Sequence, residues 1–410
     1  MSQLNLWITA VGGLTLLLGL TTGFITSRAY LPSAPMTAAA AGVLLGPYGF
    51  DVLRFSPLSE PLPLLEVLAR FTVAFAVTSI ALRLDPRYFR DRARSLVVLV
   101  GPGMVVMWLL SSLVASLALP VGLVVALLVG AVLTPTDPVL ANSIVVGETA
   151  TENIPERLRH LLSAEAGIND GVAYLFVFLP VLLLTRPVET ALADWLTATV
   201  LWEVLGAVAL GAVVGTVAGR LERLESDRET LDETSVFTLT VALTFFVLGL
   251  AALAGTDDVL AVFVAAVVYN WLADPRAEER EQRVQEVFDR LFTIPAFVVF
   301  GMAVPWADWA ALGWRGPALV VGVLLLRRLP MIVAVRRFVP PLDRPAASLF
   351  VGWFGPIGIA AVFYAILAVE RTGTELVWTA TSLVVAGSIV VHGVTAVPAT
   401  HRYGDLTHEC

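Results

Sequence analysis

Long apolar stretches separated by short polar connections run through the whole chain. A helix needs about 20 predominantly apolar residues to cross a bilayer. By that criterion, thirteen candidate spans lie near residues 6–26, 34–48, 64–82, 96–118, 121–146, 161–185, 195–219, 234–254, 257–273, 288–305, 317–335, 346–368 and 376–397. The pattern predicts an all-α polytopic membrane protein with about thirteen transmembrane helices. We expect a transmembrane domain over residues 1–398 and a short cytoplasmic tail over residues 399–410.

The composition supports a membrane protein and excludes several other classes. Hydrophobic residues make up 57% of the chain and charged residues 15%, whereas soluble domains have about 45–50% and about 25%. The net charge of −8 argues against binding to nucleic-acid phosphates. Cys410 is the one cysteine, so no disulfide can form within the chain.

The distribution of arginine predicts the orientation of the chain. All 26 basic residues are arginines, of which nineteen follow odd-numbered spans and four follow even-numbered spans. Basic residues are retained on the cytoplasmic side of a membrane. We therefore expect a protein of the cytoplasmic membrane with its N-terminus outside and its C-terminus in the cytoplasm.

Proline and glycine interrupt two of the predicted spans. Pro135 and Pro138 lie inside the fifth span, and Gly355, Pro356 and Gly358 lie inside the twelfth. A similar Phe-Thr segment precedes each interruption at nearly the same distance. Because an offset of seven spans is odd, the two halves would be inverted repeats whose interrupted helices cross. Paired interrupted spans of this kind indicate the substrate site of a transporter.

Polar side chains within the apolar spans mark the candidate site. A carboxylate at the bilayer centre costs about 2.5–3.5 kcal/mol on insertion scales and is a functional hypothesis by default. Asp137 lies between two prolines that cannot donate backbone hydrogen bonds, so we expect the helix to unwind around Thr136 and Asp137. Their oxygen atoms would suit a small hard cation. The next span carries Glu165, Asn169 and Asp170. A buried Asp170 that holds a proton or a cation, but not both, is the minimum machinery for exchange.

Charged residues in other spans are candidates for ion pairs. Arg327 and Arg328 interrupt the eleventh span. Since buried ions need partners, one of them is expected to neutralise Glu165. Glu66 and Arg70 stand four residues apart in the third span and are interpreted as a helix-surface ion pair.

The order of these motifs resembles that of the monovalent cation:proton antiporters. Thr136-Asp137-Pro138 in one span, followed by Glu165 and Asn169-Asp170-Gly171 in the next, is similar to the NhaP-like branch related to the sodium–proton exchangers. The paired arginines and the second interruption match later helices of that family. The resemblance implies a thirteen-helix inverted-repeat fold, usually homodimeric, in which a core moves relative to a fixed dimerisation domain.

The resemblance also implies roles for individual residues. Asp170 would bind a proton and Na⁺ or K⁺ alternately, supported by Asp137 and Thr136. An asparagine before this aspartate is typical of the electroneutral branch. This chain differs from many relatives at Ala166, where they have a serine, and at Ile357, where they have lysine or arginine. Without that basic residue, the partial positive ends of the broken helices would have to balance the negative charge of the site alone.

The predicted function is secondary active antiport of Na⁺ or K⁺ against H⁺, with no enzymatic activity and no cofactor. The partners would be the cation, the proton, the lipid bilayer and a second copy of the chain. A cation channel on the same fold is an alternative. Unlike an antiporter, a channel needs no carboxylate that exchanges a proton for the cation. An intramembrane aspartyl hydrolase is another, with Asp137 and Asp170 as a catalytic dyad. The four histidines show no metal-ligand spacing.

Overall fold

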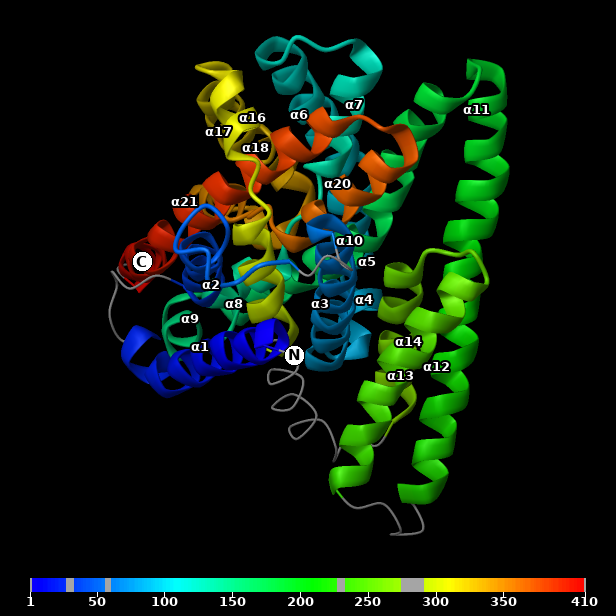
Figure 1. Ribbon diagram of the computed structural model, residues 1–410. Coiled ribbons are helices and arrows are strands. Elements are labelled where there is room, and N and C mark those ends of the chain that lie inside the picture. Colours follow the sequence, from blue (N-terminus) through cyan, green and yellow to red (C-terminus); the bar gives the residue numbers. More distant parts are fainter. Residues whose placement is uncertain (1, 27–32, 56–59, 227–232, 274–290, 409–410) are drawn as a thin grey trace.

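The computed structural model describes residues 2–26, 33–55, 60–226, 233–273 and 291–408, which are almost entirely helical and contain no strand (Figure 1). The first helices are α1 (Ser2–Thr26), α2 (Ala34–Leu45), α3 (Pro61–Arg83), α4 (Pro86–Asp91), α5 (Ala93–Val98), η1 (Leu99–Gly103), α6 (Met104–Ala118), α7 (Leu123–Val132), α8 (Pro138–Val145) and α9 (Glu148–Asn153). There follow α10 (Glu156–Thr185), α11 (Val188–Asp194), η2 (Trp195–Val204), α12 (Leu205–Ser226), α13 (Glu233–Leu253) and α14 (Asp258–Leu272). The last are the helix Leu291–Met302, α16 (Trp306–Leu312), α17 (Arg315–Leu326), α18 (Leu329–Val335), η4 (Arg336–Phe338), η5 (Pro340–Leu342), α19 (Pro345–Trp353), α20 (Ile359–Thr372) and α21 (Glu375–His408).

The all-helical membrane fold expected from the sequence is confirmed. Within the described ranges, seven helices are long and apolar enough to cross a membrane. An eighth candidate is the pair formed by Leu291–Met302 and α16, which is bent by 63°. The other predicted spans coincide with shorter helices or with helices broken in the middle, and residues 288–290 lie outside the described residues. Thirteen crossings, the repeat symmetry and the boundary at residue 398 stay predictions.

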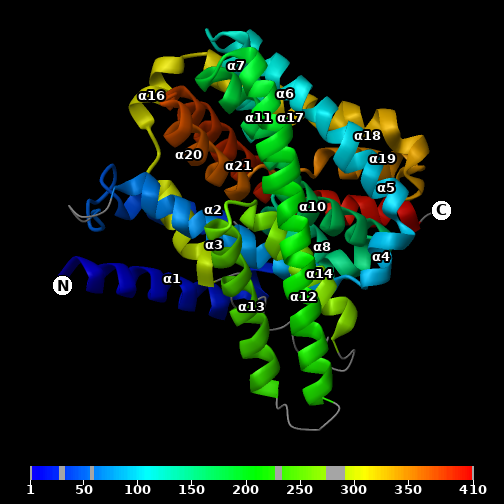
Figure 2. The same cartoon turned by 90° about the vertical axis from the view of Figure 1, so that its right-hand side faces the viewer.

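The helix α10 occupies the middle of the packing. It contacts α3, α7, α8, α14, α19 and α20, so it touches both halves of both broken helices. Figures 1 and 2 show these helices gathered around α10, with α11, η2 and α12 forming one long helix along the side of the molecule. The polar residues of α10 are thereby placed beside both interruptions.

The long helix is held against α14 by a stripe of glycines. Gly211 and Gly215 of α12 approach the backbone of α14 so closely that an added Cβ would lie 2.4 Å from the carbonyl oxygen of Ala261 or Ala265. Small residues four apart allow this close approach of membrane helices. The glycines therefore allow the backbones of α12 and α14 to pack directly against each other.

We expect Gly215→Ala to destabilise the fold by about 1–3 kcal/mol, because the new methyl group forces two backbones apart. Gly249→Ala on α13 is the matched control, since a Cβ there meets nothing within 4 Å. The measurement is thermal unfolding of the detergent-purified variants. Equal unfolding temperatures for the two variants would contradict the close packing.

Candidate ion-binding site

The two interrupted helices meet at their breaks. The first break separates α7 from α8 and covers residues 133–137, as expected from its two prolines. The second separates α19 from α20 and covers residues 354–358. The backbone N–H of Asp137 donates a hydrogen bond to the carbonyl of Pro356 at 2.8 Å. The sequence therefore located both breaks correctly, and the structure joins them into one site.

Asp137 caps the N-terminal ends of two half-helices. Its Oδ1 accepts hydrogen bonds from the backbone N–H groups of Val139 (2.7 Å) and Leu140 (3.0 Å) in α8. Its Oδ2 accepts from the N–H of Ile359, the first residue of α20. At Gly358, a Cβ would lie 2.1 Å from the same Oδ2 atom. The carboxylate therefore compensates the positive ends of both helices and needs a glycine beside it.

Arg327 binds the C-terminal ends of the other two half-helices, α7 and α19. Its Nη1 donates to the carbonyls of Leu133 (3.0 Å), Thr134 (2.7 Å) and Pro135 (2.9 Å), where α7 ends. Its Nη2 donates to the carbonyl of Gly355, just after α19. The side chain is 2% exposed. A guanidinium thus stabilises the free carbonyls of both breaks.

This position of Arg327 corrects one expectation. From the sequence alone, we expect the helix ends to balance the negative charge of the site, because Ile357 stands where many relatives have a basic residue. Ile357 is buried and its N–H donates to the hydroxyl of Ser388 at 2.8 Å. The positive charge at the breaks comes instead from a different helix segment, through Arg327.

Arg328 is the partner of Glu165. Its two Nη atoms donate to the two carboxylate oxygens at 2.7 and 2.8 Å, and both side chains are buried. Nη1 also donates to the Thr136 hydroxyl at 3.1 Å, and Nε donates to the carbonyl of Val351 at 3.0 Å. Such a bidentate pair is a strong, oriented interaction. The expected ion pair is present, and its arginine is identified.

Asn169 joins this pair to the first break. Its Oδ1 accepts from the backbone N–H of Thr136 at 3.0 Å, and its Nδ2 donates to Glu165 at 3.0 Å. The side chains of Asn169 and Thr136 are therefore engaged with protein groups. Their role as direct cation ligands stays a prediction.

Asp170 differs from all of these residues. It is fully buried, and neither of its carboxylate oxygens has a hydrogen-bond partner among the described residues. The negative charges of Asp137 and Glu165 act on it electrostatically. Its backbone carbonyl accepts from the hydroxyl of Tyr364, a residue that no motif in the sequence marks. A buried carboxylate without donors calls for a proton or a cation.

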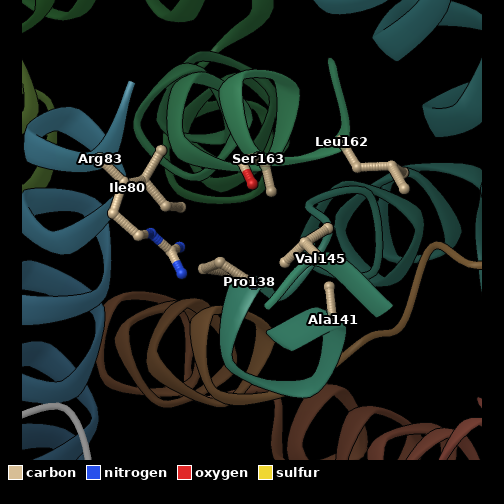
Figure 3. A pocket seen from close by; sticks show the side chains of 8 residues that line it. Ile80, Arg83, Pro138, Ala141, Val145, Leu162 and Ser163 are labelled. Carbon is tan, nitrogen blue, oxygen red and sulfur yellow. The ribbon is translucent and has the colours of Figure 1, made fainter. Parts of the chain in front are cut away.

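A narrow pocket lies beside this site, between α3, α8 and α10 (Figure 3). Its volume of about 10 Å³ is close to the space of one water molecule. The lining residues are Ile80, Arg83, Pro138, Ala141, Val145, Leu162, Ser163 and Ala166. Pro138 follows Asp137, and Ala166 lies one helical turn before Asp170. The pocket therefore lies on the side of the site nearer to the N-terminal end of α10.

Arg70 has a different partner from the one expected. Its Nε donates to the carboxylate of Asp258 at 2.5 Å, and its Nη2 donates to the carbonyl of Leu248 at 3.3 Å. No ion pair with Glu66 occurs in the described part of the chain, so the predicted Glu66–Arg70 pair is wrong. The adjacent acids Asp257 and Asp258 at the start of the ninth span were the available signal.

Comparison with known proteins identifies the family. The transmembrane family described as sodium/hydrogen exchanger matches residues 13–402. The chain belongs to the sodium/hydrogen exchanger family. This confirms the resemblance noted in the sequence.

Relatives of this family member include proteins from yeasts and bacteria. A Na⁺/H⁺ antiporter of Schizosaccharomyces pombe is 30% identical over 407 residues, which cover 90% of this chain and 87% of that protein. Na⁺/H⁺ antiporter 2 of Zygosaccharomyces rouxii is 30% identical over 93% of this chain and 51% of its own length. The K⁺/H⁺ antiporter NhaP of Alkalimonas amylolytica is 27% identical over 89% of this chain and 61% of its own length. The chain spans only 43–55% of three of the yeast relatives it matches.

A solved structure has the same fold. The sodium proton antiporter MjNhaP1 from Methanocaldococcus jannaschii at pH 8 matches with a TM-score of 0.67 and 16% identity, over 98% of both chains. The family assignment and this fold together support the reading of the broken helices as a transporter core.

We expect Arg327→Lys to destabilise this family member by about 3 kcal/mol or more, because an ammonium keeps the charge but cannot reach the carbonyls of both breaks at once. Arg337→Lys, at an exposed position, is the control. The free energy of unfolding in detergent is the measurement. A loss no larger than in the control would show that the four carbonyl contacts are unimportant for stability.

Proposed function

We propose that this protein is a secondary active antiporter that exchanges a monovalent cation, Na⁺ or K⁺, for H⁺ across the membrane. The observation that carries the proposal is Asp170, a fully buried carboxylate with no hydrogen-bond donor in the described ranges. A charge at such a position is costly unless a proton or a cation neutralises it. Because one carboxylate cannot hold both, the two fluxes are coupled.

The relatives support this activity and both candidate cations. The matched proteins of S. pombe and Z. rouxii are named Na⁺/H⁺ antiporters, and the matched NhaP of A. amylolytica is named a K⁺/H⁺ antiporter. We take Na⁺ or K⁺ as the substrate on this ground, with no resident cofactor and no enzymatic reaction.

The residues around Asp170 have distinct roles in the proposal. Asp170 is the direct ligand, and the oxygens of Asp137 and Thr136 complete the cation shell. The Asp137 carboxylate already accepts from three backbone N–H groups, which leaves lone pairs for a cation. Asn169 positions Thr136, and the Arg328–Glu165 pair fixes Asn169 in turn.

We propose one-for-one exchange. The buried site contains the two guanidinium groups of Arg327 and Arg328 and three carboxylates, those of Asp137, Glu165 and Asp170. With every group ionised, the net charge of these five side chains is −1. One proton or one monovalent cation restores neutrality, so the loaded site has the same charge with either substrate.

The setting of this activity is also proposed from the sequence and the family. We place the protein in the cytoplasmic membrane as a homodimer, with the N-terminus outside and the C-terminal residues 399–410 in the cytoplasm. The pocket beside Pro138 and Ala166 would then open the site toward the cytoplasm, where α10 begins.

The contacts argue against an aspartyl hydrolase. A catalytic dyad needs two carboxyl groups that share a proton. Asp137 is engaged with backbone N–H groups, and neither oxygen of Asp170 has a hydrogen-bond partner in the described residues. A channel is separated from an antiporter by the exchange measurement below.

We expect Asp170→Asn to abolish cation-driven dissipation of a pH gradient in proteoliposomes, because an amide cannot hold the proton or neutralise the cation. Asp91→Asn, at a side chain that is 62% exposed, should exchange like the wild type. Na⁺, K⁺ and Li⁺ are titrated separately at several pH values. Undiminished exchange in the Asp170→Asn variant would refute the mechanism, and cation flux that ignores the pH gradient would favour a channel.

We expect the exchange rate to be independent of an imposed membrane potential. Moving one net charge through 100 mV is worth about 2.3 kcal/mol. An exchanger that carries different amounts of charge in the two directions therefore responds to the potential. The measurement is initial rate in proteoliposomes at several clamped potentials and a constant pH gradient. A rate that follows the potential would exclude one-for-one exchange.

A further inference from the structure

Two buried polar residues of α21, Ser388 and His392, bind the second break. The Ser388 hydroxyl accepts a hydrogen bond from the backbone N–H of Ile357 at 2.8 Å. Nδ1 of His392 lies 3.1 Å from the same hydroxyl, and Nε2 lies 3.1 Å from the backbone carbonyl of Trp353. Trp353 is the last residue of α19. A chain of hydrogen bonds thus leaves the break at Ile357 and returns to it at Trp353.

These contacts determine which nitrogen of His392 carries the proton. A carbonyl oxygen can only accept, so Nε2 carries the proton that is donated to Trp353. In the neutral ring Nδ1 then accepts from the Ser388 hydroxyl, whose oxygen in turn accepts from Ile357. Each of the three bonds therefore has one donor and one acceptor. A second proton would turn Nδ1 into a donor and would add a positive charge near two buried guanidinium groups.

The imidazole is packed against aromatic side chains at the end of α19. Its ring centroid lies 5.7 Å from that of Trp353 and 6.2 Å from that of Phe354. The indole N–H of Trp353 donates to the Thr395 hydroxyl at 3.1 Å. Ser388, His392 and Thr395 are four and three residues apart, so they lie on one face of α21. This face binds the end of α19 through both its backbone and its side chains.

The backbone that α21 anchors is the one that binds Asp137. The carbonyl of Pro356 accepts from the N–H of Asp137, and the N–H of Ile359 donates to its carboxylate. Ile357 stands between these two residues, and its own N–H is bound to Ser388. A freed backbone N–H at this depth has no water to bind and needs a protein partner. Anchoring Ile357 therefore fixes the segment that meets Asp137 on both sides.

We propose that Ser388 and His392 are positioning residues of the ion-binding site. Through the second break they set the place of Asp137, and with it the affinity of the site for the cation. His392 acts as a neutral imidazole with its proton on Nε2, and neither side chain is a cation ligand. The effect on affinity rests on the proposed antiport, whereas the chain of hydrogen bonds is independent of it.

The first test locates the proton of His392 without transport. The histidine rings of the full chain are labelled with ¹⁵N, and the spectrum of a His392→Gln variant identifies which signals belong to His392. We expect a proton on Nε2 and an unprotonated Nδ1 that accepts a hydrogen bond. Ser388→Ala should move the Nδ1 signal, because it removes the donor. A proton on Nδ1 instead, or an Nδ1 signal that is the same with and without Ser388→Ala, would overturn the chain of hydrogen bonds.

The second test measures the half-saturating cation concentration of exchange in proteoliposomes. We expect Ser388→Ala and His392→Phe to raise it about fivefold or more, because each leaves a buried backbone group of the break without its partner. Ser388→Thr keeps the hydroxyl, and His392→Gln keeps an N–H donor for the Trp353 carbonyl. These two conservative variants should therefore recover most of the wild-type affinity. If His392→Phe does not fold, Ser388→Ala, which removes a single oxygen atom, still decides.

Thr379→Val is the matched control on the same helix, because the Thr379 hydroxyl binds the carbonyl of Glu375 within α21 and makes no contact with the break. A merely structural role would lower the unfolding temperature and the maximal rate without changing the half-saturating concentration. A half-saturating concentration in Ser388→Ala equal to that of the control would overturn the positioning role. Absence of exchange in the wild type would instead refute the antiport, and the nitrogen signals would still decide the chain of hydrogen bonds.

Discussion

The site depends on two oppositely charged side chains that hold the ends of the broken helices. Breaking a helix inside a membrane frees backbone groups that have no water to bind, and each unsatisfied group costs several kcal/mol. Arg327 takes the freed carbonyls of both breaks, and Asp137 takes the freed N–H groups. Each charge also opposes the partial charge of the helix ends it touches. The breaks are stable because these two side chains cross-connect them.

A second set of contacts turns this crossing into a rigid frame. Arg328 and Glu165 neutralise each other through two hydrogen bonds, and the remaining donor and acceptor capacity goes to Thr136 and Asn169. Since Asn169 also binds the backbone of the first break, α10 and α8 are held in a fixed relation. The polar groups of the network form hydrogen bonds with one another. A buried network rigidifies a fold when its polar groups are satisfied in this way.

The sequence predicted the parts of this site that depend on local features. Proline spacing located the break at Asp137, and the isolated acids of α10 identified Glu165 and Asp170 as functional candidates. The partner of Glu165 remained open between two adjacent arginines. Both are buried in the site, and only the packing of one helix against another decides which guanidinium meets the carboxylate. The same limit explains why Arg70 was paired with a neighbour on its own helix, although its partner Asp258 lies 188 residues away. Contacts across helices depend on register and depth, which a hydrophobic pattern does not encode.

The frame also explains why the carboxylate of Asp170 is left without a partner. Every other charge at the crossing is matched by a side chain or by helix ends, so the one uncompensated charge is that of Asp170. In the proposed mechanism, a bound proton or cation makes the site neutral, so that moving the site through the bilayer would add no electrostatic penalty to that of the frame. When Asp170 is empty and ionised, the site carries a full negative charge in a medium where such a charge is costly. Under the proposed antiport, this difference would favour movement of the loaded core and oppose movement of the empty one, which is the physical requirement for exchange without leak.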